Sequence, residues 1–87
     1  MKVKAWKIRN KETGQFSKGG TTAWDIWTKG GKTWSNIGHV KNHLHMFINR
    51  DGLLDVYKNA EVVEVEINYN ECSVIDVEQF VKKEMMN

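Results

Sequence analysis

The sequence of 87 residues has no proline and a single cysteine, Cys72. One cysteine excludes an internal disulfide and is typical of a protein in a reducing compartment. Without proline, glycine and asparagine have to form the turns. No apolar run approaches the roughly 18 residues of a membrane-spanning helix, and the N-terminal "MKVKAWKIRN" lacks the apolar core of a signal peptide. We therefore expect a cytoplasmic protein with no membrane partner.

The length predicts one domain, residues 1–87, with a small hydrophobic core. The hydrophobic fraction of 40% is ordinary for a globular protein and excludes general disorder. Because a small core gives modest stability, we expect a homodimer or a higher homo-oligomer.

Acidic residues are scarce in the first half of the chain. Residues 1–50 contain ten Lys or Arg and two acidic residues, a formal charge of +8, whereas residues 51–87 contain three basic and nine acidic residues, a charge of −6. The segment 27–47, "WTKGGKTWSNIGHVKNHLHMF", has no acidic residue and holds three lysines and all three histidines. Two interpretations follow: the basic half is a functional surface, or the two halves pair with each other in the fold.

Residue periodicity predicts an α+β domain with a mainly antiparallel sheet, the element order β-β-α-β-α, and helices packed on one face. Alternating residues predict strands at 2–9 and 61–69, the latter with Val63 and Val65 opposite Glu64, and residues 21–28 form a β-prone run. Apolar residues at helical spacing predict two helices. The first follows Ser35, with Ser35 as its N-cap and Gly52 as its C-terminal glycine, and the second spans 73–86, with Asp76 as a cap. Residues 53–60 fit a helix or a loop.

Two glycine pairs next to lysines, at 18–20 and 29–32, suggest an anion-binding surface. Consecutive backbone N–H groups and a helix N-terminus both attract oxyanions. We therefore hypothesise that Lys29, Lys32, Ser35 and Lys41 lie around one phosphate. Ordinary hairpin turns are the alternative interpretation of each glycine pair. The pattern "TKGGKTW" lacks the first glycine of a nucleotide-binding P-loop.

Aromatic and imidazole side chains accompany these lysines. Trp24, Trp27 and Trp34 either stack on bases or fill the core, and we expect at least one indole in the first half to be a stacking surface. His39 and His43 are spaced i, i+4, but the glutamate of a zinc motif is missing and there is one thiol, so we expect no metal. The histidines either contact a ligand or form a solvated helix flank.

No nucleophile–base–acid set is present, so we expect neither an enzyme nor a cofactor. The candidate ligand-binding residues are Arg9, Lys18, Trp27, Lys29, Lys32, Trp34, Ser35, Asn36, His39, Lys41 and His43.

Four strings in the first half carry a resemblance to a known family: "RN" (9–10), "TGQFSKGG" (13–20), "GKTW" (31–34) and "GHVKNHL" (38–44). With them the chain resembles small early proteins of T4-like bacteriophages. The resemblance implies a counter-defence (anti-CBASS) protein that sequesters cyclic dinucleotides such as cGAMP in the host cytoplasm and so blocks cyclic-oligonucleotide immunity. The resemblance does not identify any ligand-binding residue in this chain. The alternatives are a nucleic-acid-binding phage accessory protein and an inhibitor that binds a host protein.

Overall fold

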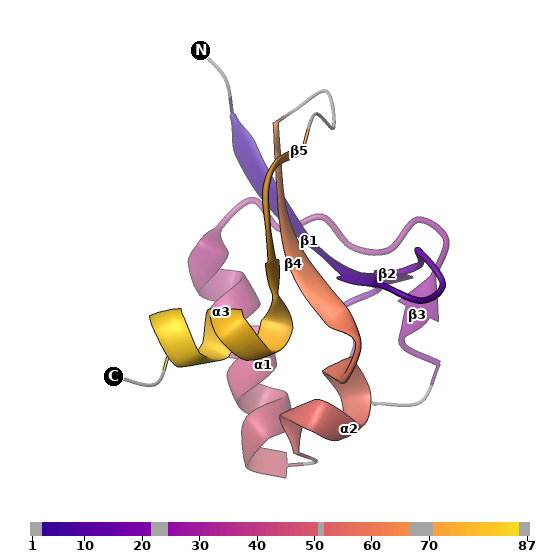
Figure 1. Cartoon of the computed structure of the whole chain (residues 1–87), viewed down its shortest axis with the longest axis vertical. Coiled ribbons are helices and arrows are strands. Elements are labelled where there is room, and N and C mark those ends of the chain that lie inside the picture. The colour runs from indigo at the N-terminus through magenta and orange to yellow at the C-terminus, as the bar shows by residue number, and fades with distance from the viewer. Residues whose placement is uncertain (1–2, 22–24, 51, 67–70, 86–87) are drawn as a thin grey trace.

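The structure is a computed structural model that describes residues 3–21, 25–50, 52–66 and 71–85 (Figure 1). It has the predicted α+β class, with more elements than predicted. In chain order these are β1 (Lys4–Asn10), β2 (Phe16–Ser17), β3 (Trp27–Thr28), α1 (Ile37–Arg50), α2 (Leu53–Tyr57), β4 (Ala60–Glu66), β5 (Glu71–Asp76) and α3 (Val77–Glu84).

The strands form one sheet in the order β3-β2-β1-β4-β5, and all neighbours are antiparallel. The central pair, β1 and β4, is in register over its whole length, from Lys4 opposite Glu66 to Asn10 opposite Ala60. Trp34 forms an isolated bridge with Trp6 of β1, on the edge of β1 that also pairs with β2 at Arg9. The segment that leads directly into α1 is therefore held against β1.

The helices pack on one face of the sheet; in Figure 1, α1 and α3 lie to the left of the strands and α2 lies below them. Ile8 of β1 and Val62 of β4 are paired on this face and are almost fully buried. The core around them joins all three helices to the sheet. Its helical members are Val40, Leu44 and Phe47 of α1, Tyr57 of α2, and Val77, Phe80 and Val81 of α3.

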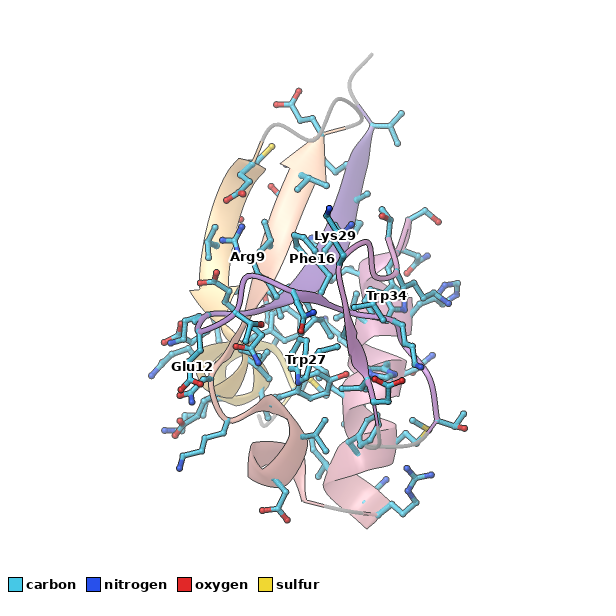
Figure 2. The ribbon with its side chains drawn as sticks, turned by 90° about the vertical axis from the view of Figure 1, so that its right-hand side faces the viewer. Arg9, Glu12, Phe16, Trp27, Lys29 and Trp34 are labelled. Atoms are coloured by element: carbon cyan, nitrogen blue, oxygen red, sulfur yellow. The ribbon has the colours of Figure 1, made fainter. Side chains whose placement is uncertain are left out.

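Val63 and Val65 are buried on the opposite face of β4. We expected them to be the buried side of a half-buried strand, with Glu64 outside, but Val62 on the Glu64 face is buried as well, so β4 is buried on both faces. The guanidinium of Arg9 donates to Glu61 at 2.6 Å and to Glu71 at 2.8 Å on this second face. Arg9 is labelled on this side of the molecule in Figure 2.

Several predicted boundaries were wrong. Residues 73–86 were expected to be a helix, but Glu71–Asp76 form β5, because "SVID" pairs with β4. The helix begins only after Asp76, the predicted cap. Within the run 21–28, the described strand is limited to Trp27–Thr28. Residues 53–57 are helical, and residues 67–69 of the predicted strand lie outside the described residues.

The described residues contain no helix that is both long enough and apolar enough to span a membrane.

Candidate ligand-binding site

The two glycine loops lie side by side in the fold. The backbone N–H of Lys32 donates to the carbonyl of Ser17 at 2.8 Å, which joins the second loop to the end of β2. A Cβ atom built on Gly19 would lie 2.7 Å from Cδ of Lys32 and 3.0 Å from the Trp34 ring. We call residues 18–20 and 29–32 together the glycine-loop surface, on which the side chains of Lys18, Lys29 and Lys32 are exposed.

The second loop is fixed by close packing against β2. Gly31 has a φ of 64°, and a Cβ there would lie 2.3 Å from Cβ of Phe16. The ammonium group of Lys7 donates to the carbonyl of Gly30 at 2.7 Å and lies 4.3 Å from the centre of the Phe16 ring. Figure 2 views the molecule from this side, with Phe16 and Lys29 labelled. The position of Lys29 is therefore determined by contacts of its neighbours rather than by its own side chain.

Much of the basic charge of the first half is paired with the acidic second half. Besides the bonds of Arg9 to Glu61 and Glu71, Lys4 pairs with Glu64 at 3.5 Å and Lys11 with Asp76 at 3.0 Å. The second interpretation of the charge asymmetry therefore holds for β1 and the residue that follows it. Arg9, a candidate ligand residue, is one of these paired groups and lies on the face away from the helices.

Three of the candidate lysines form no ion pair within the described part of the chain: Lys29, Lys32 and Lys41. Lys18 has only an exposed contact with Asp25 at 3.7 Å. The candidate lysines that form no ion pair among the described residues thus lie on the glycine-loop surface and on α1.

The rotation of α1 separates Lys41 from Lys32. Successive residues of an α-helix turn by about 100°, so Lys41 and His43 project about 200° apart. His43 is near Lys32 and Trp34, since its ring centre lies 5.4 Å from that of Trp34 and the charge of Lys32 acts on it. Lys41 follows Ile37 by one turn on the other flank. The structure therefore places Lys32 and Lys41 on two sides of α1, and not around one point.

Asn36 caps the N-terminus of α1. We had expected Ser35 to be the cap, which was wrong. Oδ1 of Asn36 accepts the N–H of Gly38 at 2.7 Å, and its carbonyl accepts the N–H of His39 at 3.0 Å. Both N–H groups are thus already satisfied within the protein. The side chains of Ser35 and His39 are exposed beside this cap.

The indoles differ in their exposure. Trp34 is 4% exposed and belongs to the core. Trp27 is half-buried and packs edge-to-face with Tyr57, with the two ring centres 5.5 Å apart. Trp24 lies outside the described residues. Trp6 is half-buried and lines a cavity, and sequence reasoning had assigned it only to a strand.

His43 takes part in a buried hydrogen-bond chain. Its Nε2 shares a hydrogen bond with the hydroxyl of Tyr57, which shares another with Oγ of Ser17 at 2.9 Å, and the N–H of Gly19 donates to that Oγ at 3.1 Å. Burial, with a smaller contribution from the charge of Lys32, lowers the pKa of His43 to about 4. Burial also raises the pKa of Tyr57. At neutral pH the chain is uncharged and connects the first glycine loop to α1 and α2.

A cavity of about 420 Å³ lies over the sheet between α1 and α3, within the size range of small-molecule sites. Its floor follows three residues paired across the sheet, in the order Trp6, Glu64 and Ser73. Trp34, which pairs with Trp6, continues this row outside the cavity lining. The cavity is lined by Trp6, Ile37, Val62, Glu64, Ser73, Val74, Ile75, Phe80, Lys83 and Glu84. Sequence reasoning missed this site, because Glu64 was interpreted as a solvent-facing residue. The sequence signal that could have indicated this site is the alternation of β1, which puts Trp6 on the same face as Lys4 and Ile8.

Across residues 3–21, 25–50, 52–66 and 71–85, no cluster of three or more His, Cys, Asp or Glu side chains could hold a metal ion.

A scan against protein-family models, a search of curated proteins and a search of solved structures each found no match to this chain. The resemblance to small proteins of T4-like bacteriophages therefore stays a prediction.

Proposed function

We propose that this protein binds a cyclic dinucleotide, such as cGAMP, and holds it without cleaving it. The observation that carries the proposal is the cavity beside Trp6, with lysines on both flanks of the adjoining helix that form no ion pair among the described residues. Neighbouring strands lie about 4.8 Å apart, so the row from Trp34 to Ser73 spans about 14 Å. One ligand with two bases and two phosphates is large enough to extend from the cavity across the start of α1.

Trp6 supplies the stacking surface in this proposal. Its ring is half-buried, so its position is fixed by the core while part of it still lines the cavity. Stacking of a base on an aromatic side chain contributes about 1–3 kcal/mol. Trp34 and His43 support the site from within the core, since both are buried.

The phosphates would be bound by side-chain cations. Lys32 and Lys41 lie on the two flanks of α1, and Ser35 and His39 are exposed at the helix start. Lys29 and Lys18 extend the positive surface outward. Arg9 has no part in this arrangement, because its guanidinium is bonded to carboxylates on the other face.

Retention without cleavage is supported by the state of His43. His43 is neutral and bonded to Tyr57, so it is not available to remove a proton from a ribose hydroxyl. In a phage-infected cell, a protein that holds the signal intact in the host cytoplasm would block immune signalling by mass action. A homodimer would suit a nearly symmetric ligand, since each subunit presents the same surface to one half of it.

Nucleic-acid binding through the basic half is the alternative, and calorimetry separates the two. We would titrate the protein with cyclic dinucleotides, a linear dinucleotide and single-stranded DNA at about 50 and 200 mM salt. We expect heat with a cyclic dinucleotide, a shallow salt dependence, and ligand that is recovered intact from the heated complex. Strong binding of DNA alone, with a steep loss of affinity in salt, would favour the alternative.

Variants locate the site. Trp6→Ala and Lys32→Ala should each weaken binding about tenfold or more, as expected for the loss of one stacking or one phosphate contact. Lys58→Ala removes an exposed lysine beyond α2 and serves as the control. If no cyclic dinucleotide gives heat, or if the control loses as much affinity as the two test variants, the proposal is wrong.

A further inference from the structure

The cavity between α1 and α3 contains a carboxylate in an unusual position for an anion-binding protein. Glu64 lies in the floor between Trp6 and Ser73, to which it is directly paired across the sheet. Its side chain is 21% exposed, so the carboxylate is held within the cavity wall and not extended into solvent. At the α3 side the cavity is lined by one cation, Lys83, and a second carboxylate, Glu84. Glu64 itself would repel a phosphate placed against it, so a nucleotide must place another part beside Glu64.

Lys4, the ion-pair partner of Glu64, leaves most of the hydrogen-bonding capacity of the Glu64 carboxylate unused. The ammonium group of Lys4 lies 3.5 Å from Oε2, beyond the usual length of a charge-assisted hydrogen bond, and the Lys4 side chain is 57% exposed. An ionised carboxylate only accepts hydrogen bonds, and its two oxygens accept two parallel N–H groups. The cavity floor therefore fits a flat group that presents two adjacent N–H donors on one edge.

Among the nucleobases, guanine has that edge. Its ring N1–H and its exocyclic amino group are neighbouring donors, whereas adenine and cytosine each place an acceptor nitrogen beside one amino group. Uracil has one N–H between two carbonyl oxygens, which a carboxylate repels. A purine also offers the largest face for stacking on the half-buried ring of Trp6.

We propose that this cavity is a guanine-binding pocket, in which Glu64 accepts both donors of the base edge while the base stacks on Trp6. The hydroxyl of Ser73, the next residue in the row, is placed to donate to the guanine carbonyl oxygen or to a bridging water. The inference rests on the proposed nucleotide-binding function for its ligand class, but it concerns base selectivity, which the binding proposal does not fix.

The test is a comparison of bases on matched ligands. We would measure the dissociation constants of cyclic di-GMP, cyclic di-AMP, GMP and AMP for the whole protein. Each guanine ligand should bind about tenfold or more tightly than its adenine counterpart, which is the discrimination expected of one bidentate base contact. Equal binding of guanine and adenine ligands overturns the guanine assignment and leaves the binding function standing. Binding of GMP without binding of any cyclic dinucleotide overturns the function and leaves the pocket assignment standing.

The variant Glu64→Gln keeps the shape of the side chain and replaces one acceptor oxygen by a donor. It should remove the preference for guanine while the affinity for adenine ligands changes little. Glu78→Gln, on the exposed side of α3, is the matched control and should retain the preference. If Glu64→Gln keeps the full preference, Glu64 does not read the base.

A readout that does not depend on affinity comes from the indole N–H signals in a nitrogen–proton correlation spectrum. The signal of Trp6 is assigned by its loss in Trp6→Phe and also reports whether Glu64→Gln is folded. GMP should shift the Trp6 signal in the wild-type protein. Shifts confined to the other tryptophans would place the ligand elsewhere and overturn the proposal.

Discussion

The buried imidazole of His43 makes a definite prediction about stability in acid. Its side chain is 8% exposed, and burial lowers its pKa from the ordinary 6.5 to about 4. When the pH falls below about 6.5, the unfolded chain takes up a proton at this position and the folded protein does not. The contribution of His43 to stability is therefore complete above about pH 6.5 and is lost as the pH falls toward 4.

The magnitude follows from the pKa difference of about 2.5 units. One unit corresponds to about 1.36 kcal/mol, so the free energy of unfolding should fall by about 3 kcal/mol between pH 6.5 and 4 through this residue alone. A domain of this size has a total stability of about 4–13 kcal/mol. The loss is thus large enough to shift the urea midpoint clearly.

The variant His43→Gln isolates the effect, because glutamine can still bond to the Tyr57 hydroxyl but does not titrate. We would measure urea unfolding by circular dichroism across this pH range for the wild-type protein, His43→Gln and the control His45→Gln, an exposed position on the same helix. Carboxylates titrate in all three proteins, so their contribution cancels in the comparison. The wild-type protein and His45→Gln should lose about 3 kcal/mol more than His43→Gln. Equal losses in all three would refute the reasoning.

Two further predictions concern the local structure that positions the candidate site. Gly31→Ala should destabilise the protein by about 1–3 kcal/mol in urea unfolding, since its φ is positive and the new Cβ would meet Phe16, whereas Gly30→Ala, with no atom within 4 Å, should change stability by less than about 0.5 kcal/mol. Asn36→Ala should cost about 1 kcal/mol through loss of the α1 cap, and Ser35→Ala should cost less than about 0.5 kcal/mol. The reverse order within either pair would contradict the contacts described.

The long elements could be predicted from the sequence because their patterns are local. The alternation of β1 and the apolar stripe of α1 each repeat over several residues. The two-residue strands β2 and β3 contain no repeat and exist because their neighbours pair with them. β5 was mistaken for the first turn of a helix, since "SVIDV" fits either pattern and only the pairing of Val63 with Val74 decides between them.

The candidate site was predictable only in part. The sequence suggested that each glycine pair with its lysine could bind an anion, but it did not show that both loops pack against the same end of β2. It could not show which flank of α1 would carry Lys41, because that depends on how the helix is rotated against the sheet. Nor could it place Glu64 beside Trp6, because the register that pairs them joins residues 58 positions apart in the chain.

The charge asymmetry of the chain links these results. A basic first half and an acidic second half suggested either a functional surface or mutual neutralisation, and the fold uses both in different places. On β1, pairing with β4 and β5 brings Lys4 and Arg9 to carboxylates. No carboxylate among the described residues forms an ion pair with Lys32 or Lys41, which lie before and on α1. Sheet pairing thus compensates the charges of Lys4 and Arg9 on β1 with carboxylates. Positive charge that a ligand could bind lies instead around the start of α1, next to the cavity.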